Sequence, residues 1–435
     1  MAKRQFFSNR LGAILSMVGV SVGLGNVWRF PYMMGQNGGS AFLVVYLVFT
    51  LFLAIPALMS ELALGRETRK GPLGTFTQIL GPVAGRIVGY LLLITVLVAD
   101  SYYLVVIGNV AYTSVFSITQ GFGPETAEAY QSGLGNGLLQ LLITYGVLAI
   151  SLYVIWLGVR KGIERSSRLI VPFFVIVALY LIVNTLSMEG AGAALATFLQ
   201  PEWSSIDADV LFAGLGQAFF SLGLGGTFLL VYGSYMKDRE PIPQVAVSTG
   251  LGDMGAALFA SLFLIPAMLV FNLDMASGPQ LIFNTLPELF AKMPYGRVAG
   301  SQFLVALTGI AFLSNLAALE VFANTLSEPG YTRLSKRQII LLIGGIELVL
   351  ILPSALNPEL IGVLDMIFGS GMQTLGSIIS IIALTWFVKK RKALAQIYGS
   401  GWQGKLPAIY FGLVKWVIPT ILLIILISYI ITTIS

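Results

Sequence analysis

Apolar runs about as long as a membrane is thick recur along this 435-residue chain. A helix of about 20 apolar residues crosses the hydrocarbon core of a bilayer and satisfies its own backbone hydrogen bonds there. The runs are continuous rather than alternating, which argues against a β-barrel. We therefore predict an all-α integral membrane protein with eleven spans, at about 11–35, 41–64, 87–118, 136–157, 167–187, 211–235, 244–271, 298–325, 338–354, 360–388 and 407–432.

The basic residues fall in every second segment between these spans and at the N-terminus. Of the 25 lysines and arginines, all but Arg29, Lys292 and Arg297 follow this pattern. Because cytoplasmic segments of membrane proteins are enriched in lysine and arginine, the pattern predicts a cytoplasmic N-terminus and an outside C-terminus. It also rules out nucleic-acid binding as the reason for the net charge of +5.

Cysteine and histidine are both absent from the sequence. A chain without them cannot build a disulfide, a thiolate or imidazole metal site, or a Ser-His-Asp catalytic centre. No soluble domain is evident between the spans. The sequence therefore predicts a protein that is not an enzyme and whose function lies within the membrane.

Two of the predicted spans are interrupted by glycine at mid-depth. The first reads GVSVGLGNVWRFP at 19–31, and the sixth reads GQAFFSLGLGGTFLLVYGSY at 216–235. Close packing of glycines explains the first stretch only in part, because Asn26 and Arg29 follow directly and should not face lipid. Bare backbone is tolerated at this depth only where it lines a cavity. Breaks in matching positions predict a five-plus-five inverted repeat, whose carbonyls bind a cation and whose N–H groups bind an anion.

Three stretches of the chain resemble the neurotransmitter:sodium symporter family, in its bacterial amino-acid transporter branch. They are SNRLGAILSMVGVSVGLGNVWRFPYMMGQNGGSAFLVVYLV in the first two spans, GVRKGIERSSRLIVP before the fifth and GLGQAFFSLGLGGTF in the sixth. The resemblance implies the LeuT-type fold in a single domain, with repeat one at about 9–187, repeat two at about 211–388 and an extra helix at about 407–432. It also implies sodium-coupled symport of an amino acid by alternating access in the cell (inner) membrane, by a monomer or weak dimer.

The resemblance further implies two sodium sites made of oxygen ligands, which suit a hard cation. The residues matched to the first site are Ser21, Asn26, Ser221 and Asp253, and those matched to the second are Gly19, Val22, Ala311, Ser314 and Asn315. Many members of the family carry asparagine at Asp253, and other chloride-independent members place an acid at Ala257. We therefore expect Asp253 to supply the internal negative charge, so that transport is independent of chloride. The alternative for Asp253 is a paired buried acid without an ion.

The same resemblance places the substrate between the two breaks. Gly23 stands where monoamine transporters carry an acid, so the substrate is expected to bring its own carboxylate, as an L-amino acid does. Gly223 and Gly226 replace bulkier residues of a leucine-preferring relative, which favours a large apolar or aromatic side chain. Asp100 is unusual, and it either contacts a polar or cationic side chain or pairs with a neighbouring span. The expected substrate-binding residues are Ser21, Gly23, Leu24, Gly25, Ala99, Asp100, Tyr103, Phe220, Ser221, Gly223, Gly226, Asn315 and Leu319.

Gate residues are carried over from the family in the same way. Arg29 and Asp365 match an outer gate, and Arg4 matches an inner gate whose partner falls near Glu328. Glu61 matches an acid expected to brace the backbone of the first break.

Two rival functions stay open at this point. One is a proton-coupled amino-acid carrier on the same fold, with Asp253 or Asp100 as the proton site. The other is a membrane enzyme that uses Asp100, Glu61 and Asp253 as acids, which the missing histidines and cysteines disfavour.

Overall fold

The computed structural model describes residues 6–200, 203–275, 278, 281–402 and 404–434, with side chains as far as residue 428 in the last helix. Within these residues, eight helical segments are long and apolar enough to span a membrane, and a bent pair at the start makes a ninth. The segment Gly137–Leu186 has 50 residues, which is about 75 Å of helix and too long for one crossing of a core about 30 Å thick. It therefore forms two spans, and with the broken sixth span the predicted number of eleven is reached.

The first six spans contain the following helices. Span one is α1 (Arg10–Ser21), a π-helical turn (Gly25–Arg29) and α2 (Phe30–Gln36); span two is α3 (Ser40–Phe49), a π-helical turn (Thr50–Ala54) and α4 (Ile55–Thr68); span three is α6 (Ala84–Thr119). Span four is α8 (Gly137–Gly158), span five is α9 (Arg165–Leu186) after a π-helical turn (Val159–Glu164), and span six is α11 (Ala208–Ser221) and α12 (Phe228–Ser234).

The remaining spans and the short connecting helices complete the chain. Span seven is α13 (Ile242–Val270), span eight is α15 (Gly296–Leu326) and span nine is α16 (Lys336–Leu356). Span ten consists of α17 (Glu359–Leu364), a π-helical segment (Asp365–Met372), α18 (Gln373–Ile382) and a second π-helical segment (Ala383–Phe387). Span eleven consists of α20 (Leu406–Gly412), a π-helical turn (Leu413–Val417) and α21 (Ile418–Ile434). The connecting helices are α5 (Pro72–Leu80), α7 (Ala127–Leu134), α10 (Ala191–Phe198), α14 (Leu286–Lys292) after a π-helical turn (Leu281–Thr285), and α19 (Lys390–Tyr398), together with a 3-10 turn (Trp203–Ser205).

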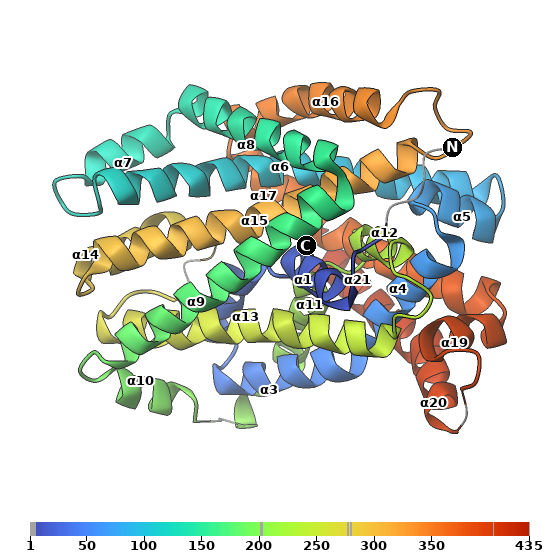
Figure 1. Cartoon of the computed structure of the whole chain (residues 1–435). Helices are drawn as coiled ribbons and strands as arrows, with labels where there is room; N and C mark the ends of the chain where they lie inside the picture. Colours follow the sequence, from blue (N-terminus) through green and yellow to red (C-terminus); the bar gives the residue numbers. More distant parts are fainter. Residues whose placement is uncertain (1–5, 201–202, 276–277, 279–280, 403, 435) are drawn as a thin grey trace.

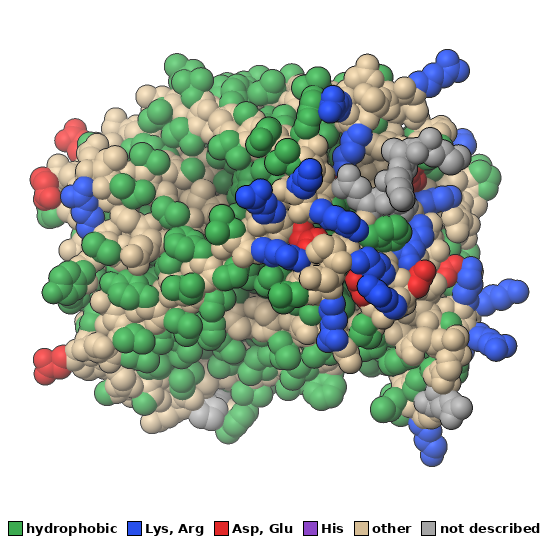
Figure 2. All heavy atoms as spheres, in the orientation of Figure 1, with side chains coloured by type: hydrophobic (Ala, Val, Ile, Leu, Met, Phe, Trp, Pro, Cys, Tyr) green, Lys and Arg blue, Asp and Glu red, His purple; other side chains and the backbone are tan. Residues whose placement is uncertain are grey.

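The connecting helices gather at the two ends of the bundle. In Figure 1, α7, α10 and α14 lie at one end, and α5, α19 and the N-terminus lie at the other. Figure 2 shows lysine and arginine side chains concentrated over the end that carries the N-terminus, whereas acidic side chains stand out at the opposite end. This separation is the one that the basic segments of the sequence predict.

Both predicted helix breaks are present. The two halves of span one meet at an angle of 59° between Ser21 and Gly25. In span six the helix stops at Ser221 and resumes at Phe228, and the backbone between them takes left-handed φ values of 64° at Gly223 and 83° at Gly225. Residues with a side chain rarely adopt these φ values, whereas glycine adopts them readily, so the two glycines allow the sixth span to unwind here.

Close packing of α4 against α12 holds the second half of span six in place. A Cβ atom added at Gly233 would lie 2.5 Å from the carbonyl oxygen of Leu62, and Gly65 meets the backbone of Leu230 in the same way. Small residues that let two helix backbones approach are typical of helix contacts in membranes. The contact fixes span two beside the second break.

Candidate functional site

A cavity of about 130 Å³ lies between the two breaks. Its walls include a large share of the residues that the sequence predicts to bind substrate: Ser21, Gly23, Leu24, Gly25, Ala99, Asp100, Tyr103, Phe220, Ser221 and Gly223. Gly226, Asn315 and Leu319 belong to the same prediction but lie outside this lining in the described part of the chain. Leu319 and Asn315 are buried behind it.

The ring of Phe228 occupies the space beside Gly226 in which we expected the side chain of the substrate. A Cβ atom on Gly226 would lie 2.6 Å from Cδ2 of the Phe228 ring, whereas one on Gly223 would have 3.7 Å to the same atom. The expected enlargement of the cavity is therefore wrong at Gly226, because an aromatic ring from the next turn fills it. Phe228 is not among the residues expected at the cavity, although it is the first residue of α12 after the break, as Phe220 is one of the last of α11 before it.

Asp253 is the centre of a buried polar cluster at the first predicted sodium site. Its carboxylate accepts hydrogen bonds from the Asn26 amide at 2.7 Å and from the Ser221 hydroxyl at 2.8 and 3.0 Å. The Tyr46 hydroxyl lies 3.5 Å from the second carboxylate oxygen. Asn26 also accepts the backbone N–H of Gly23 at 2.9 Å, so one amide ties the first break to span seven. The cluster supplies carboxylate, hydroxyl and carboxamide oxygens, the donor set that a hard cation prefers.

Ser314, one residue of the second predicted sodium site, lies where the end of α1 packs against α15. The Ser314 hydroxyl donates to the carbonyl of Val20 at 3.1 Å. A Cβ atom on Gly23 would lie 3.3 Å from this hydroxyl oxygen and 3.4 Å from that of Tyr103, so a side chain here would be tight. The hydroxyl of Tyr103 in turn lies against the backbone N–H of Leu24.

Asn315, the other side chain predicted at this second site, faces a different partner. Its amide donates to Oδ1 of Asp100 at 2.8 Å. The contact joins α15 to α6, so Asp100 does bond a neighbouring span. The second oxygen of Asp100 and the carbonyl oxygen of Asn315 have no hydrogen-bond partner among the described residues.

Glu61 braces a break, but not the one expected. Its Oε1 accepts the backbone N–H of Gly225 at 2.7 Å, so it holds the sixth span and not the first. The side chain is fully buried on α4. An unwound segment leaves N–H groups without helical partners, and Glu61 satisfies one of them.

Aromatic and charged side chains meet at the predicted outer gate. The guanidinium of Arg29 stacks over the ring of Phe220 at 4.1 Å. Asp365, its predicted gate partner, accepts a hydrogen bond from the Tyr102 hydroxyl at 3.0 Å and interacts electrostatically with Arg29.

Phe7, near the start of the described chain, packs against the end of α12. Phe7 is fully buried, and its ring lies 5.7 Å from that of Tyr232 and 6.0 Å from that of Tyr235. The Tyr235 hydroxyl donates to Glu320 at 2.6 Å, and Lys336 lies 3.1 Å from the same carboxylate. Arg4, the predicted inner gate, lies outside the described residues, and Glu328 accepts the backbone N–H of Gly71.

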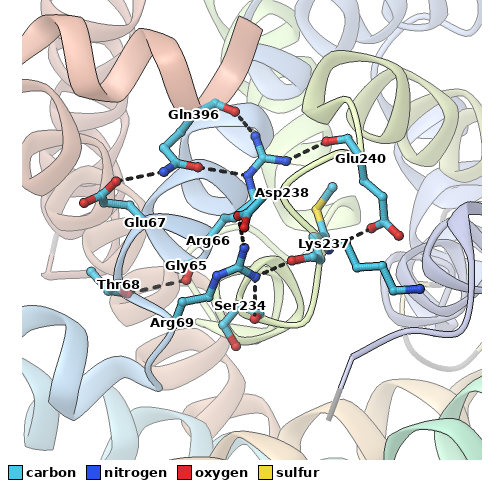
Figure 3. Close-up of polar contacts among 11 residues, drawn as sticks. Gly65, Arg66, Glu67, Thr68, Arg69, Ser234, Lys237, Asp238, Glu240 and Gln396 are labelled. Carbon is cyan, nitrogen blue, oxygen red and sulfur yellow. Dashed lines mark hydrogen bonds and ion pairs between the residues drawn. The ribbon is translucent and has the colours of Figure 1, made fainter. Parts of the chain in front are cut away.

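Figure 3 shows a second set of polar contacts at this end, which joins span two to the segment after span six. Arg66 donates to the carbonyl of Glu240 at 2.5 Å and also reaches Gln396, whose amide donates to Glu67 at 2.9 Å. Arg69 donates to the carbonyls of Ser234 and Met236 and pairs with Asp238. Burial raises the pKa of the Glu240 carboxyl above its usual value, although Lys237 and Arg66 oppose this. These contacts join α4 to the segment between α12 and α13 and to α19.

Comparisons with known proteins agree with this geometry. The profile of the Sodium:neurotransmitter symporter family matches residues 4–132 and 129–435. A sodium-dependent transporter of Haemophilus influenzae is 28% identical over 98% of both chains, and the sodium-dependent transporter YhdH of Bacillus subtilis is 25% identical over 98% of this chain and 97% of its own.

A solved structure is similar over the whole molecule. The crystal structure of MhsT in complex with L-phenylalanine superposes with a TM-score of 0.88 at 29% sequence identity, and covers 98% of this chain and all of its own.

Proposed function

The chain belongs to the sodium:neurotransmitter symporter family and is a sodium-dependent transporter, and we propose that it carries an L-amino acid together with sodium by alternating access. The observation that supports this most directly is the cavity between two unwound helices, with oxygen-rich clusters beside it. Backbone carbonyls and N–H groups at such breaks complement a cation and a carboxylate at once. Shared ligands then make each solute raise the affinity of the other by the same factor.

For the substrate we propose an amino acid with a large apolar or aromatic side chain. The α-carboxylate would meet the N–H groups of Leu24 and Gly25 and the hydroxyl of Tyr103. The side chain would lie among Val96, Ala99, Phe220, Phe228 and Ala318, which line the cavity. The similarity to MhsT, whose structure holds L-phenylalanine, supports this choice.

For the ions we propose two sodium sites. Asn26, Ser221 and Asp253, with the carbonyl of Ser21, would hold the first, and the Asn26 amide would turn its oxygen toward the ion. Gly19, Val22, Ala311, Ser314 and Asn315 would hold the second. Asp253 supplies a buried negative charge to the first site, so we propose that transport is independent of chloride.

For the membrane orientation we propose a cytoplasmic N-terminus in the cell (inner) membrane, with Arg29 and Asp365 facing outward. The basic end of the molecule in Figure 2 supports this assignment. The polar contacts in Figure 3 then form the inner closure, which must open in each cycle.

Uptake by the purified protein in proteoliposomes tests the proposal. Phenylalanine, leucine and lysine serve as labelled probes, with an inward gradient of sodium or of potassium. We expect accumulation in sodium and none in potassium. Uptake that stays flat across a sodium titration, but follows a pH gradient, would instead favour the proton-coupled carrier.

A further inference from the structure

Asp100 differs from the other acids around the cavity. Asp253 accepts hydrogen bonds from two helix breaks, and Asp365 has the Tyr102 hydroxyl and the field of Arg29. Asp100 lines the cavity with a side chain that is 3% exposed, and only its Oδ1 accepts a hydrogen bond, from Asn315. Its Oδ2 has no partner among the described residues.

A second buried carboxyl group lies near Asp100. Glu347 on α16 is fully buried, interacts electrostatically with Asp100, and has no hydrogen-bond partner on either oxygen in the described part of the chain. Neither lysine nor arginine occurs among the described residues that line the cavity. Among the described residues, the lining of the cavity therefore provides no basic side chain to pair with Asp100.

The position of Asp100 suits the far end of a substrate side chain. Val96, Ala99, Asp100 and Tyr103 share one face of α6, because residues three and four apart lie side by side on a helix. Asp100 stands three residues, about 4.5 Å along the helix axis, from Tyr103, which the proposed function assigns to the substrate carboxylate. Val96 and Ala99 provide an apolar wall beside it.

A buried carboxylate oxygen without a donor is unfavourable, and a ligand that supplies the donor removes this penalty. A ligand with an apolar tip leaves the oxygen unpaired and shut off from water. Sites built to bond a polar group reject the analogue that lacks it far more strongly than an apolar pocket rejects a change of size. We therefore expect the unpartnered Oδ2 of Asp100 to make the affinity depend on whether the substrate side chain ends in a hydrogen-bond donor.

We propose that Asp100 is a specificity-determining residue that accepts a hydrogen bond from an N–H or O–H group at the far end of the substrate side chain. This inference rests on the proposed function, because it concerns the same cavity. The preferred substrates are large amino acids whose apolar stem or ring ends in a donor. Compared with the purely apolar or aromatic side chains of the proposed function, a long apolar stem that ends in a cation should bind more tightly, because the cation also supplies a counter-charge to Asp100.

Pairs of amino acids matched in size test this inference. Binding to the purified protein in sodium is measured by calorimetry for lysine and norleucine, and for tyrosine and phenylalanine. We expect the donor-bearing member to bind at least about tenfold more tightly in each pair, with the larger ratio for lysine. Equal or tighter binding of norleucine and phenylalanine would overturn the inference.

The Asp100→Leu variant removes the acceptor and keeps a similar volume. We expect the preference for lysine over norleucine to fall at least about tenfold, while norleucine still binds in a sodium-dependent way, which shows that the variant is folded. Glu288→Gln is the matched control, because Glu288 is an exposed acid on α14 whose partner is Lys292. A preference that survives in Asp100→Leu would contradict the role of Asp100.

Glu347→Gln separates charge from hydrogen bonding. Glu347 does not line the cavity, and we expect it to act on the substrate only through its charge, as a positioning residue for Asp100. The variant should therefore lower the ratio of the lysine affinity to the norleucine affinity, while the ratio of the tyrosine affinity to the phenylalanine affinity changes less than twofold. Equal losses in both ratios would contradict this electrostatic role.

Failure of the inference can be told from failure of the proposed function. Sodium-dependent binding of phenylalanine and norleucine without any preference for donors keeps the function and removes the inference. Absence of sodium-dependent binding for all four probes removes both.

Discussion

Asp100 lines the cavity and Asp253 bonds Asn26 and Ser221, which also line it, but the surroundings of the two acids differ. Asp253 on α13 accepts donors from Asn26 and Ser221, which belong to the two broken spans. Asp100 on α6 accepts one donor, from the unbroken span eight, and keeps a second oxygen without a partner in the described part of the chain.

The difference shows how identical side chains can serve different ligands. Asn26 and Ser221, the donors to Asp253, also carry oxygens that can bind an ion in place of these hydrogen bonds. The carboxylate of Asp253 then complements the charge of a cation between the breaks. The second oxygen of Asp100 has no donor from the described residues, and it is the acceptor that we propose for a donor group on the substrate. One acid would thus set the coupling to sodium and the other the choice of substrate.

Replacing Asp253 should have the largest effect. Asp253→Ala removes the charge and leaves the donors of Asn26 and Ser221 without their acceptor. We expect the sodium concentration at half-saturation to rise about 100-fold or more, because hydrogen bonds to a charged group contribute about 1.5–3 kcal/mol each. Sodium titration of the purified protein by thermal shift measures this, and Glu288→Gln serves as the control. A sodium midpoint within threefold of the wild type would remove Asp253 from the site.

The asparagine variants of the two acids should change stability in opposite directions. Asp100→Asn removes an unpaired buried charge and keeps the acceptor for Asn315, so the melting temperature should rise by a few degrees. Asp253→Asn weakens a satisfied cluster, so the melting temperature should fall by a similar amount. Scanning calorimetry without amino acid or sodium tests both. A lower melting temperature in both variants would mean that the wild-type protein already stabilises the carboxyl group of Asp100.

Glu61 is a third buried acid, and replacing it should have an effect between those of the Asp253 variants and of anion exchange. Among the described residues, its hydrogen bond comes from the backbone N–H of Gly225 and not from a side chain. Glu61→Ala leaves the N–H of Gly225 buried without an acceptor, at a cost of about 1–3 kcal/mol. We expect a lower maximal rate of uptake in proteoliposomes. Glu61→Gln keeps an acceptor and should recover most of the rate. Equal loss in both variants would indicate that the charge, not the hydrogen bond, is needed.

Exchange of the external anion should have the smallest effect. Because Asp253 supplies the negative charge beside the first sodium site, replacement of chloride by gluconate should change the sodium midpoint less than twofold. A marked rise in gluconate would show that a halide shares this role.

Several features of this site could be predicted from the sequence. The helix breaks follow from glycines at mid-depth in apolar runs, and the meeting of Asn26, Ser221 and Asp253 follows from the family motifs. These residues lie on or beside the breaks, where sequence position nearly fixes spatial position. The arrangement of spans follows from length, hydropathy and the placement of basic residues.

Other features depend on packing between helices, which periodicity does not reveal. The family match placed Glu61 at the first break, and the contact of α4 with α12 shows instead that it bonds Gly225. The ring of Phe228 fills the room at Gly226 because the direction of α12 points it there. Asn315 faces Asp100 because α15 packs closely on α6. A helix pattern tells which face a residue shares, but not which neighbour meets it.

The central claim is that sodium and an amino acid bind together between the two breaks. Calorimetric titration of the wild-type protein with sodium, without and then with saturating lysine, tests this claim most directly. We predict that lysine raises the affinity for sodium by the same factor by which sodium raises the affinity for lysine, and that potassium does neither. An affinity for sodium that is unchanged by lysine, and by phenylalanine in its place, would contradict the account.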